Sequence, residues 1–275
     1  MDGPTNSLGT AEVRGMPETA ARAKGTHREG APSEAAAALE VREMFTRIAP
    51  RYDLVNHLLS LELDHLWRAR TARRLRAILA RPDALILDLC CGTGDLAFSF
   101  ARFGKARIIG ADFSRAMLLR ARRKSIAQAR AHGALPLPFF EADALRLPFA
   151  DSSFDLVATA FGFRNLVNYQ DGLREILRTL KSGGTLAILE FTEPPPGLLG
   201  NLYRWYFRSL LPHIGKLISG DPDAYSYLPA SVALFPRAPD LASLMRAVGY
   251  ASVDFQSWTL GAVALHTGSK PSGPR

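Results

Sequence analysis

Residues 87–96 read LDLCCGTGDL, an apolar run that leads directly into a glycine-rich turn. Gly92 and Gly94 flank Thr93, and Asp88 stands just before them. Glycine adopts positive φ angles and lets the backbone come close to a ligand, and a helix that follows the turn presents free amides to that ligand. In α/β proteins such a turn after the first strand is a typical nucleotide site. The stretch therefore predicts a bound nucleotide, and the rest of the sequence has to indicate which one.

The sequence around this turn alternates short apolar runs with helical segments. Helices are expected at about 95–103, 115–131 and 170–180, between apolar runs at 84–89, 107–112, 137–142, 154–160 and 185–191. Such alternation predicts a parallel sheet with right-handed crossovers. Two further strand-like runs, 251–260 and 261–270, meet near Gly261 without a helix between them and predict an antiparallel hairpin at the sheet edge. The expected fold class is α/β: a Rossmann-like, doubly wound, mostly parallel seven-stranded sheet with this hairpin and N-terminal accessory helices.

The chain before the sheet divides into a tail and helices. Residues 1–32 mix Gly, Pro, Thr, Ala and charges without a period, which predicts a disordered tail. Ser33 is a suitable helix N-cap, and apolar residues then recur at helical spacing until Pro50. A second helical stripe runs from Leu63 to Ile78 and ends before Pro82.

Composition narrows the class of protein. The chain has 275 residues, a net charge of +8 and two cysteines, Cys90 and Cys91, which are adjacent and cannot link distant segments. No apolar run is long enough to span a membrane and no signal peptide is evident, so we expect a cytoplasmic protein. Residues 41–82 hold nine arginines against four carboxylates. A basic surface suits nucleic acid, anionic lipid or an acidic ligand, and a general arginine bias explains it equally well.

Taken alone, the glycine turn fits two kinds of ligand. Gly92, Gly94 and Ala97 also satisfy the G-x-G-x-x-A pattern of dinucleotide-binding proteins. Asp112 ends the second apolar run, where a carboxylate accepts from the ribose hydroxyls of either ligand. A tight turn with a capping aspartate is the structural alternative.

Three features favour a nucleoside that carries an amino acid. Asp88, next to the turn, suits an ammonium group and would repel a pyrophosphate. Asp143 ends the third apolar run, from which its side chain could accept from an adenine amine. The hairpin at the C-terminus implies a reversed last strand, which a dinucleotide fold does not need.

With these features, the chain resembles the class I S-adenosylmethionine-dependent methyltransferases. More narrowly, it resembles the family that C-methylates demethylmenaquinol and the related ubiquinone precursor, over about residues 40–270. The glycine turn and SGGTL (182–186) are common to methyltransferases, whereas RYDLVNHLLS (51–60) and FGFRN (161–165) are more specific to the quinone family. Further matching stretches are GADFSRAML (110–118), ADALRLPFADSSFD (142–155), YSYLPASVALFP (225–236) and GAVALHTG (261–268).

The resemblance implies a donor, a substrate and a set of binding residues. S-adenosylmethionine would be the methyl donor, and demethylmenaquinol the substrate, in the last step of menaquinone biosynthesis. A benzoquinol precursor of ubiquinone, or another small molecule, is the alternative substrate. Asp88 and the backbone of the glycine turn would hold the methionine portion. The positions that match cofactor contacts are Asp88, Gly92, Thr93, Gly94, Asp112, Asp143 and Ala144.

Methylation of a quinol carbon suggests catalytic candidates. Deprotonation of the neighbouring hydroxyl makes the ring carbon electron-rich, so the site must stabilise a developing phenolate. Arg164 and Asn165 suit that task, although Arg164 could instead pair with a structural carboxylate. Tyr52 and Asp53 either cover the site or merely close the turn after Pro50. The histidines show no metal-ligand spacing, so no metal is expected.

The resemblance also organises the chain into one domain, residues 33–270. Its expected parts are lid helices at 33–82, a cofactor-binding core at 83–193, a helical insertion at 194–235 and a closing helix and hairpin at 236–270. Residues 197–220 are rich in Leu, aromatic and basic residues, which suits an isoprenoid tail or peripheral contact with the inner membrane face. A helix packed on the core, or a dimer contact, is equally compatible. No nucleic-acid recognition motif is present, so no nucleic-acid partner is expected.

Overall fold

A computed structural model gives the fold of most of the chain. It describes Gly25, residues 33–60 and 62–194, Gly197, Tyr227 and residues 230–272. The predicted disordered tail therefore lies outside the described residues except at Gly25. Most of the predicted insertion at 194–235, including His213, lies outside them too.

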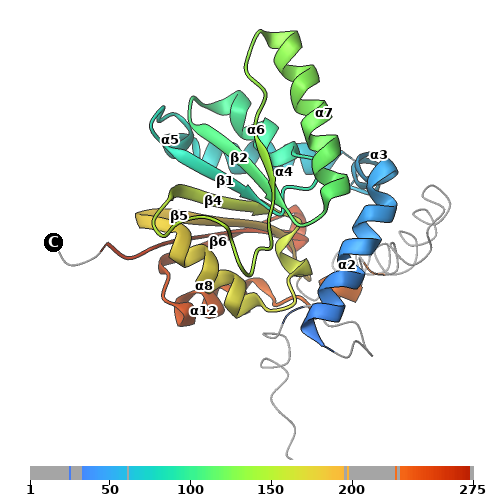
Figure 1. The fold of residues 1–275 in the computed structure, drawn as a ribbon. Coiled ribbons are helices and arrows are strands. Elements are labelled where there is room, and N and C mark those ends of the chain that lie inside the picture. Colours follow the sequence, from blue (N-terminus) through green and yellow to red (C-terminus); the bar gives the residue numbers. More distant parts are fainter. Residues whose placement is uncertain are drawn as a thin grey trace, which may run out of the picture.

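The described chain is built on one seven-stranded sheet in the order β3-β2-β1-β4-β5-β7-β6 (Figure 1). Strands β1 to β5 pair in parallel, whereas β7 pairs antiparallel with both β5 and β6. The predicted fold class and the reversed C-terminal strand are thereby confirmed. The strands are β1 Leu85–Leu89, β2 Arg107–Asp112, β3 Phe139–Glu141, β4 Phe154–Ala160, β5 Leu180–Phe191, β6 Ala251–Trp258 and β7 Val263–Ser269.

Helices cover both faces of the sheet because successive side chains of a strand point to opposite sides. Ile86 of β1 packs among residues of α4, α5, α6 and α7, while Leu87 packs among residues of α8 and α12. The helices are α2 Glu34–Ile48, α3 Tyr52–Leu59, α4 Leu63–Arg74, α5 Arg76–Leu79, α6 Asp95–Phe103, α7 Arg115–His132, α8 Tyr169–Thr179 and α12 Ala238–Val248.

The first helices stand beyond the carboxyl ends of the parallel strands, next to α7 (Figure 1). As predicted, Ser33 is the N-cap of α2, and its hydroxyl accepts from the amide of Ala36. Near Pro50 the α-helix gives way to a short 3-10 turn, η1 (Ala49–Arg51), and a new helix, α3, begins at Tyr52. The sequence indicated the stop at Pro50 but not the helix that follows.

Gly25 lies against the backbone of Val167 and Asn168. A Cβ atom placed on Gly25 would lie 2.2 Å from the carbonyl oxygen of Val167, so the two backbones touch. None of the helices in the described parts of the chain has the length and the hydropathy needed to cross a membrane.

Candidate functional site

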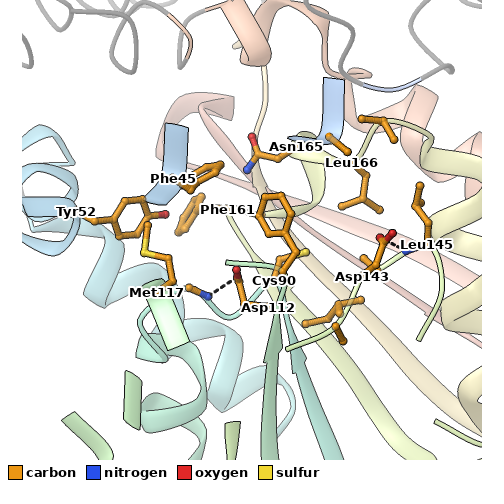
Figure 2. Close-up of a pocket in the computed structure, with 18 residues that line it drawn as sticks. Phe45, Tyr52, Cys90, Asp112, Met117, Asp143, Leu145, Phe161, Asn165 and Leu166 are labelled. Atoms are coloured by element: carbon orange, nitrogen blue, oxygen red, sulfur yellow. Dashed lines mark hydrogen bonds between the residues drawn. The ribbon is translucent and has the colours of Figure 1, made fainter. Parts of the chain in front are cut away.

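A cavity of about 760 Å³, including the open space at its mouth, lies at the carboxyl ends of β1, β2 and β4 (Figure 2). The α2 and α3 helices supply one wall, and the loops after the strands supply the other walls. The lining residues include Phe45, Tyr52, Cys90, Gly92, Asp112, Phe113, Met117, Asp143, Ala144, Phe161, Asn165 and Leu166.

The glycine turn contains three residues in the left-handed region, of which Cys90 and Gly92 line the cavity. Cys90 has φ +54°, Gly92 has φ +54° and Gly94 has φ +90°. A Cβ on Gly92 would meet only the Tyr52 ring, at 3.8 Å, so this residue leaves its backbone open toward the cavity. Gly94 does not line the cavity. A Cβ there would lie 2.9 Å from the Phe139 ring, so Gly94 serves the close packing of the turn.

Asp112 joins the glycine turn to the end of β2. One carboxylate oxygen accepts from the amide of Gly92 at 2.8 Å (Figure 2). The other accepts from the amide of Ser114 at 2.8 Å. Burial raises the pKa of Asp112 to about 6 despite these hydrogen bonds. Each oxygen retains acceptor capacity, so Asp112 can still receive hydroxyl donors from a ligand.

Asp143 and Ala144 also line the cavity, just beyond the end of β3. Asp143 accepts a hydrogen bond from the amide of Leu145 at 2.9 Å, which fixes its side chain (Figure 2). The ends of β2 and β3 therefore bring two carboxylates to one cavity, as the sequence predicted.

Asp88 lies beneath the turn and does not line the cavity. One of its oxygens accepts from the amide of Ala97 in the first turn of α6, at 2.9 Å, and the other has no hydrogen-bond partner within the described structure. Burial raises the pKa of Asp88 to about 8. Its contact with a ligand ammonium stays a prediction that this geometry does not support.

Thr93 is also turned away from the cavity, into a polar cluster that links three elements. Its hydroxyl donates to Asp53 of α3 at 2.5 Å. The ammonium of Lys124 on α7 lies 3.2 Å from Asp53, 3.1 Å from the Thr93 hydroxyl, and forms an ion pair with Asp95 of α6. This Thr93–Asp53–Lys124–Asp95 cluster fastens the lid helix α3 to the glycine turn.

Tyr52 and Asp53 point in different directions from the start of α3. Asp53 enters the polar cluster, whereas Tyr52 lines the cavity beside Phe45, whose ring centroid lies 6.0 Å from that of Tyr52 (Figure 2). Burial raises the pKa of the Tyr52 phenol to about 12. The phenol is therefore protonated at neutral pH and serves as a hydrogen-bond donor.

Arg164 does not line the cavity. Its side chain is buried and forms an ion pair with Glu190 at 2.8 Å, and it also donates to the carbonyl of Phe161 and to Ser231. This is the structural pairing that the sequence left open, and the predicted direct catalytic contact has no geometric support. Asn165, the next residue, does line the cavity, and its side-chain oxygen accepts from the Tyr227 hydroxyl at 3.1 Å.

Sequence reasoning missed the apolar part of the cavity wall. Phe45, Phe113, Met117, Phe161 and Leu166 all line it. Three of them, Phe113, Met117 and Phe161, lie in the stretches 110–118 and 161–165 that carry the family resemblance, but their spacing is equally typical of core residues. Only Phe161 has an unusual backbone, with φ +59°, and a sequence does not show that.

A separate group of potential metal ligands lies away from the cavity. His57, Glu62, Asp64 and His65 place ligand atoms within 4.8 Å of one another. Asp64 is already bonded to His57 at 2.7 Å and forms an ion pair with Arg68. The His57 and His65 rings are stacked, so their in-plane lone pairs do not converge on one point. We assign no metal to this group.

Comparison with known proteins agrees with this geometry. The model of the ubiE/COQ5 methyltransferase family matches residues 33–270. A demethylmenaquinone methyltransferase of Thermus thermophilus is 48% identical over 229 residues, which are 83% of this chain and all of the relative. A ubiquinone/menaquinone biosynthesis C-methyltransferase of Azotobacter vinelandii is 38% identical over 240 residues, 86% of this chain and 92% of the relative.

A solved structure from Thermotoga maritima, described as a SAM-dependent methyltransferase, has the same fold. Its TM-score is 0.57 at 18% identity, and the match covers 84% of this chain and 99% of that one. At this identity the likeness concerns the fold alone. The family model and the sequence relatives also identify the family. The chain belongs to the ubiE/COQ5 methyltransferase family.

Proposed function

We propose that this protein transfers the methyl group of S-adenosylmethionine to a ring carbon of demethylmenaquinol, giving menaquinol in the last step of menaquinone biosynthesis. The observation that carries the proposal is a cavity that combines Asp112 and Asp143 with the open backbone of Gly92 and with aromatic side chains. The names of the relatives from Thermus thermophilus and Deinococcus radiodurans, both demethylmenaquinone methyltransferases, support the substrate.

The residues present fit the methyl donor. Asp112 accepts from the ribose hydroxyls, and Asp143 accepts from the adenine amine, because a carboxylate offers acceptors only. Phe113 offers an aromatic face to the adenine, and Gly92 leaves room for the methionine portion. The bound donor supplies an electrophilic methyl group on a positively charged sulfur.

The other end of the cavity suits an aromatic acceptor. Phe45, Tyr52 and Phe161 enclose the quinol ring between apolar surfaces and keep water from the transferred methyl group. Tyr52 donates from its phenol, and Asn165, held by Tyr227, donates from its amide to the substrate oxygen. These hydrogen bonds strengthen as the oxygen gains negative charge.

Charge and atoms balance in this reaction. The quinol hydroxyl gives its proton to water at the cavity mouth, and the oxygen pushes electron density to the neighbouring ring carbon. That carbon forms a bond to the methyl group as the bond between methyl and sulfur breaks. The ring carbon then gives its own proton to water, the oxygen takes a proton back, and the ring becomes aromatic again as a quinol. Arg164 acts indirectly, by holding the turn that carries Phe161 and Asn165.

A benzoquinol precursor of ubiquinone is the second candidate substrate. Relatives of this chain from Azotobacter vinelandii and Stutzerimonas stutzeri are named for ubiquinone and menaquinone biosynthesis. Either quinol carries an isoprenoid tail, so we place the enzyme in the cytoplasm, in contact with the inner membrane face.

Genetic complementation tests the proposed function. The full chain is expressed in a bacterium that makes both quinones and lacks its own quinone methyltransferase, and the extracted quinones are identified by mass. Restored menaquinone with persisting benzoquinone precursor supports the first proposal, and restoration of both supports dual activity. Accumulated demethylmenaquinone despite a folded, expressed protein contradicts the proposal. Asp112→Ala, which should bind the methyl donor more weakly, is the matched variant and should restore much less menaquinone.

A further inference from the structure

The α7 helix is purely cationic. Its 18 residues, Arg115–His132, contain no aspartate or glutamate. They do contain six arginines or lysines: Arg115, Arg120, Arg122, Arg123, Lys124 and Arg130. A helix with one sign of charge repels itself, so internal ion pairs do not explain this composition.

Part of this charge serves the fold. Arg120 donates to the carbonyls of Ala49 and Pro50 in η1, and Arg122 donates to the carbonyl of Phe139. Lys124 belongs to the Thr93–Asp53–Lys124–Asp95 cluster. The three remaining arginines are exposed and have no hydrogen bond or ion pair with any described residue: Arg115, Arg123 and Arg130.

These arginines alternate with exposed aliphatic side chains. The buried side of α7 consists of Met117, Leu118, Ala121, Ser125 and Ala129. On the opposite side, Leu119, Arg123, Ile126 and Arg130 follow one another at spacings of four, three and four residues, which places them in one stripe. Leu119 is 45% exposed and Ile126 is 43% exposed. We call these four residues the outer stripe of α7.

The outer stripe begins near the lid, at Leu119, but lies on the side of α7 that faces away from the cavity. Met117 of the same helix lines the cavity, and Arg120 holds the start of the lid. Figure 1 shows one end of α7 beside α3 and α2, with the rest of the helix extending away from them. A surface that rests on this stripe would therefore come close to the lid at the Leu119 end.

We infer that the outer stripe of α7 docks the enzyme on an anionic lipid bilayer. Arg123 and Arg130 reach lipid phosphates, while Leu119 and Ile126 enter the boundary between headgroups and acyl chains, as in interfacial amphipathic helices. The proposed function gives this contact a purpose, because an isoprenoid quinol is dissolved in the bilayer, and the inference rests on it to that extent. The contact itself does not require a bound substrate.

A nucleic acid fits the stripe less well. Phosphates of a polynucleotide would satisfy the arginines, but they offer nothing to two exposed aliphatic side chains placed between them. Burial in the lipid interface stabilises both kinds of side chain at once.

Vesicle flotation of the full chain tests the inference. Vesicles contain either equal parts of phosphatidylglycerol and phosphatidylcholine or phosphatidylcholine alone. We expect binding to the anionic vesicles only, with a fall at high salt because the charges become screened. The variant Arg123→Glu with Arg130→Glu should bind at least about thirtyfold more weakly, since each basic residue near the surface contributes about a factor of five. The variant Leu119→Ser with Ile126→Ser should also bind more weakly.

A matched control separates the stripe from net charge. Arg70 and Arg74 of α4 are exposed and lie on another helix. Arg70→Glu with Arg74→Glu makes the same change in charge and should alter vesicle binding by less than about threefold. Every variant must retain S-adenosylmethionine affinity and methyl transfer to a soluble short-tailed quinol, which shows that it is folded.

Four results would overturn the inference. The first two are that the natural chain does not bind anionic vesicles, and that the stripe and control arginine variants lose binding equally. The third is that the serine variant binds vesicles fully. The fourth is that the same arginines bind single-stranded RNA more tightly than vesicles. Vesicle binding is measured without quinol, so a wrong substrate assignment would appear in the methyl-transfer assay and leave the flotation result unchanged.

Discussion

The guanidinium of Arg164 lies 2.8 Å from the carboxylate of Glu190, and both side chains are almost completely buried. Glu190 also accepts from the backbone amides of Arg164 and Phe191, and Arg164 donates to the carbonyl of Phe161. The pair thereby ties the turn after β4 to the end of β5. Because that turn carries Phe161 and Asn165 into the cavity, a buried ion pair outside the cavity fixes part of its wall.

Glu190→Gln should destabilise the protein strongly. The substitution leaves the buried charge of Arg164 without its counter-ion, which typically costs about 3–5 kcal/mol. Urea unfolding should show this loss. The double variant Arg164→Met with Glu190→Gln should recover most of it, since no buried charge then remains.

The exposed pair of Arg174 and Asp171 provides the control, because Arg174→Ala should change stability by less than about 1 kcal/mol. If Glu190→Gln is no more destabilising than Arg174→Ala, the pair does not support the turn and Arg164 has a different task.

The free energy of unfolding should decrease as the pH rises from 6 to 8, because of the raised pKa of Asp88. Burial raises the pKa of its folded-state carboxyl to about 8, whereas an unfolded aspartate titrates near pH ~4. Between these values the folded state holds a proton that the unfolded state has lost, so the free energy of unfolding decreases with pH. The decrease from pH 6 to pH 8 should be about 2 kcal/mol.

Asp88→Asn removes this titration and should flatten the pH dependence. Asp112, with a pKa raised to about 6, acts in the same direction but mainly at lower pH. Urea unfolding of both proteins at several pH values gives the comparison. If the free energy of unfolding varies with pH in the same way in both proteins, Asp88 is ionised throughout, and a protonated Asp88 does not accept the hydrogen bond from the Ala97 amide.

Lys124→Met should weaken binding of the methyl donor about tenfold. Without the ammonium, the carboxylates of Asp53 and Asp95 lack the cation between them, and α3 is held less firmly over the glycine turn. Calorimetry with S-adenosylmethionine measures the effect, and Lys124→Arg should restore part of the affinity. Arg123→Met, one residue away and without a described partner, should bind normally. Equal affinities for Lys124→Met and Arg123→Met would show that the cluster does not position the lid.

The effects of substitutions at Gly162 and Cys90 on the free energy of unfolding should depend on each other. A Cβ on Gly162 would lie 2.5 Å from the Cβ of Cys90, which itself has φ +54°. Gly162→Ala should therefore destabilise the protein by about 1–3 kcal/mol and weaken donor binding. Cys90→Gly relieves the contact and suits the positive φ, so the double variant should regain stability. A double variant that is as unstable as the sum of the single changes would contradict direct coupling.

The fold could be predicted well because its signals are local. The strand at Phe154–Ala160 and the helix at Asp95–Phe103 have the bounds that their patterns indicate. The strand that begins at Leu180 was placed five residues late, because Ser182, Gly183 and Gly184 are typical of a turn. Leu180 nevertheless pairs with Phe154 of β4, and the strand is irregular between Leu180 and Thr185, with Gly183 at φ +73°.

The site could be predicted only in part, because residue type does not fix the direction of a side chain. Asp112 and Asp143 follow strand ends and reach the cavity as expected. Asp88 and Thr93 stand in the same stretch but turn to a helix amide and to Asp53. These contacts join segments that are far apart in the sequence or separated by a turn, and they depend on the packing of α3 and α6 around the turn.

The central claim is that this chain methylates a quinol carbon, and an isotope experiment tests it most directly. The purified full chain is incubated with S-adenosylmethionine that carries a ¹³C methyl group and with a reduced, short-tailed demethylmenaquinol. Carbon NMR and mass spectrometry of the product should show one labelled methyl group bonded to a ring carbon. Asp112→Ala should give the same product only at a much higher donor concentration. A label on a hydroxyl oxygen, or no labelled quinone from a protein that binds the donor, would contradict the account.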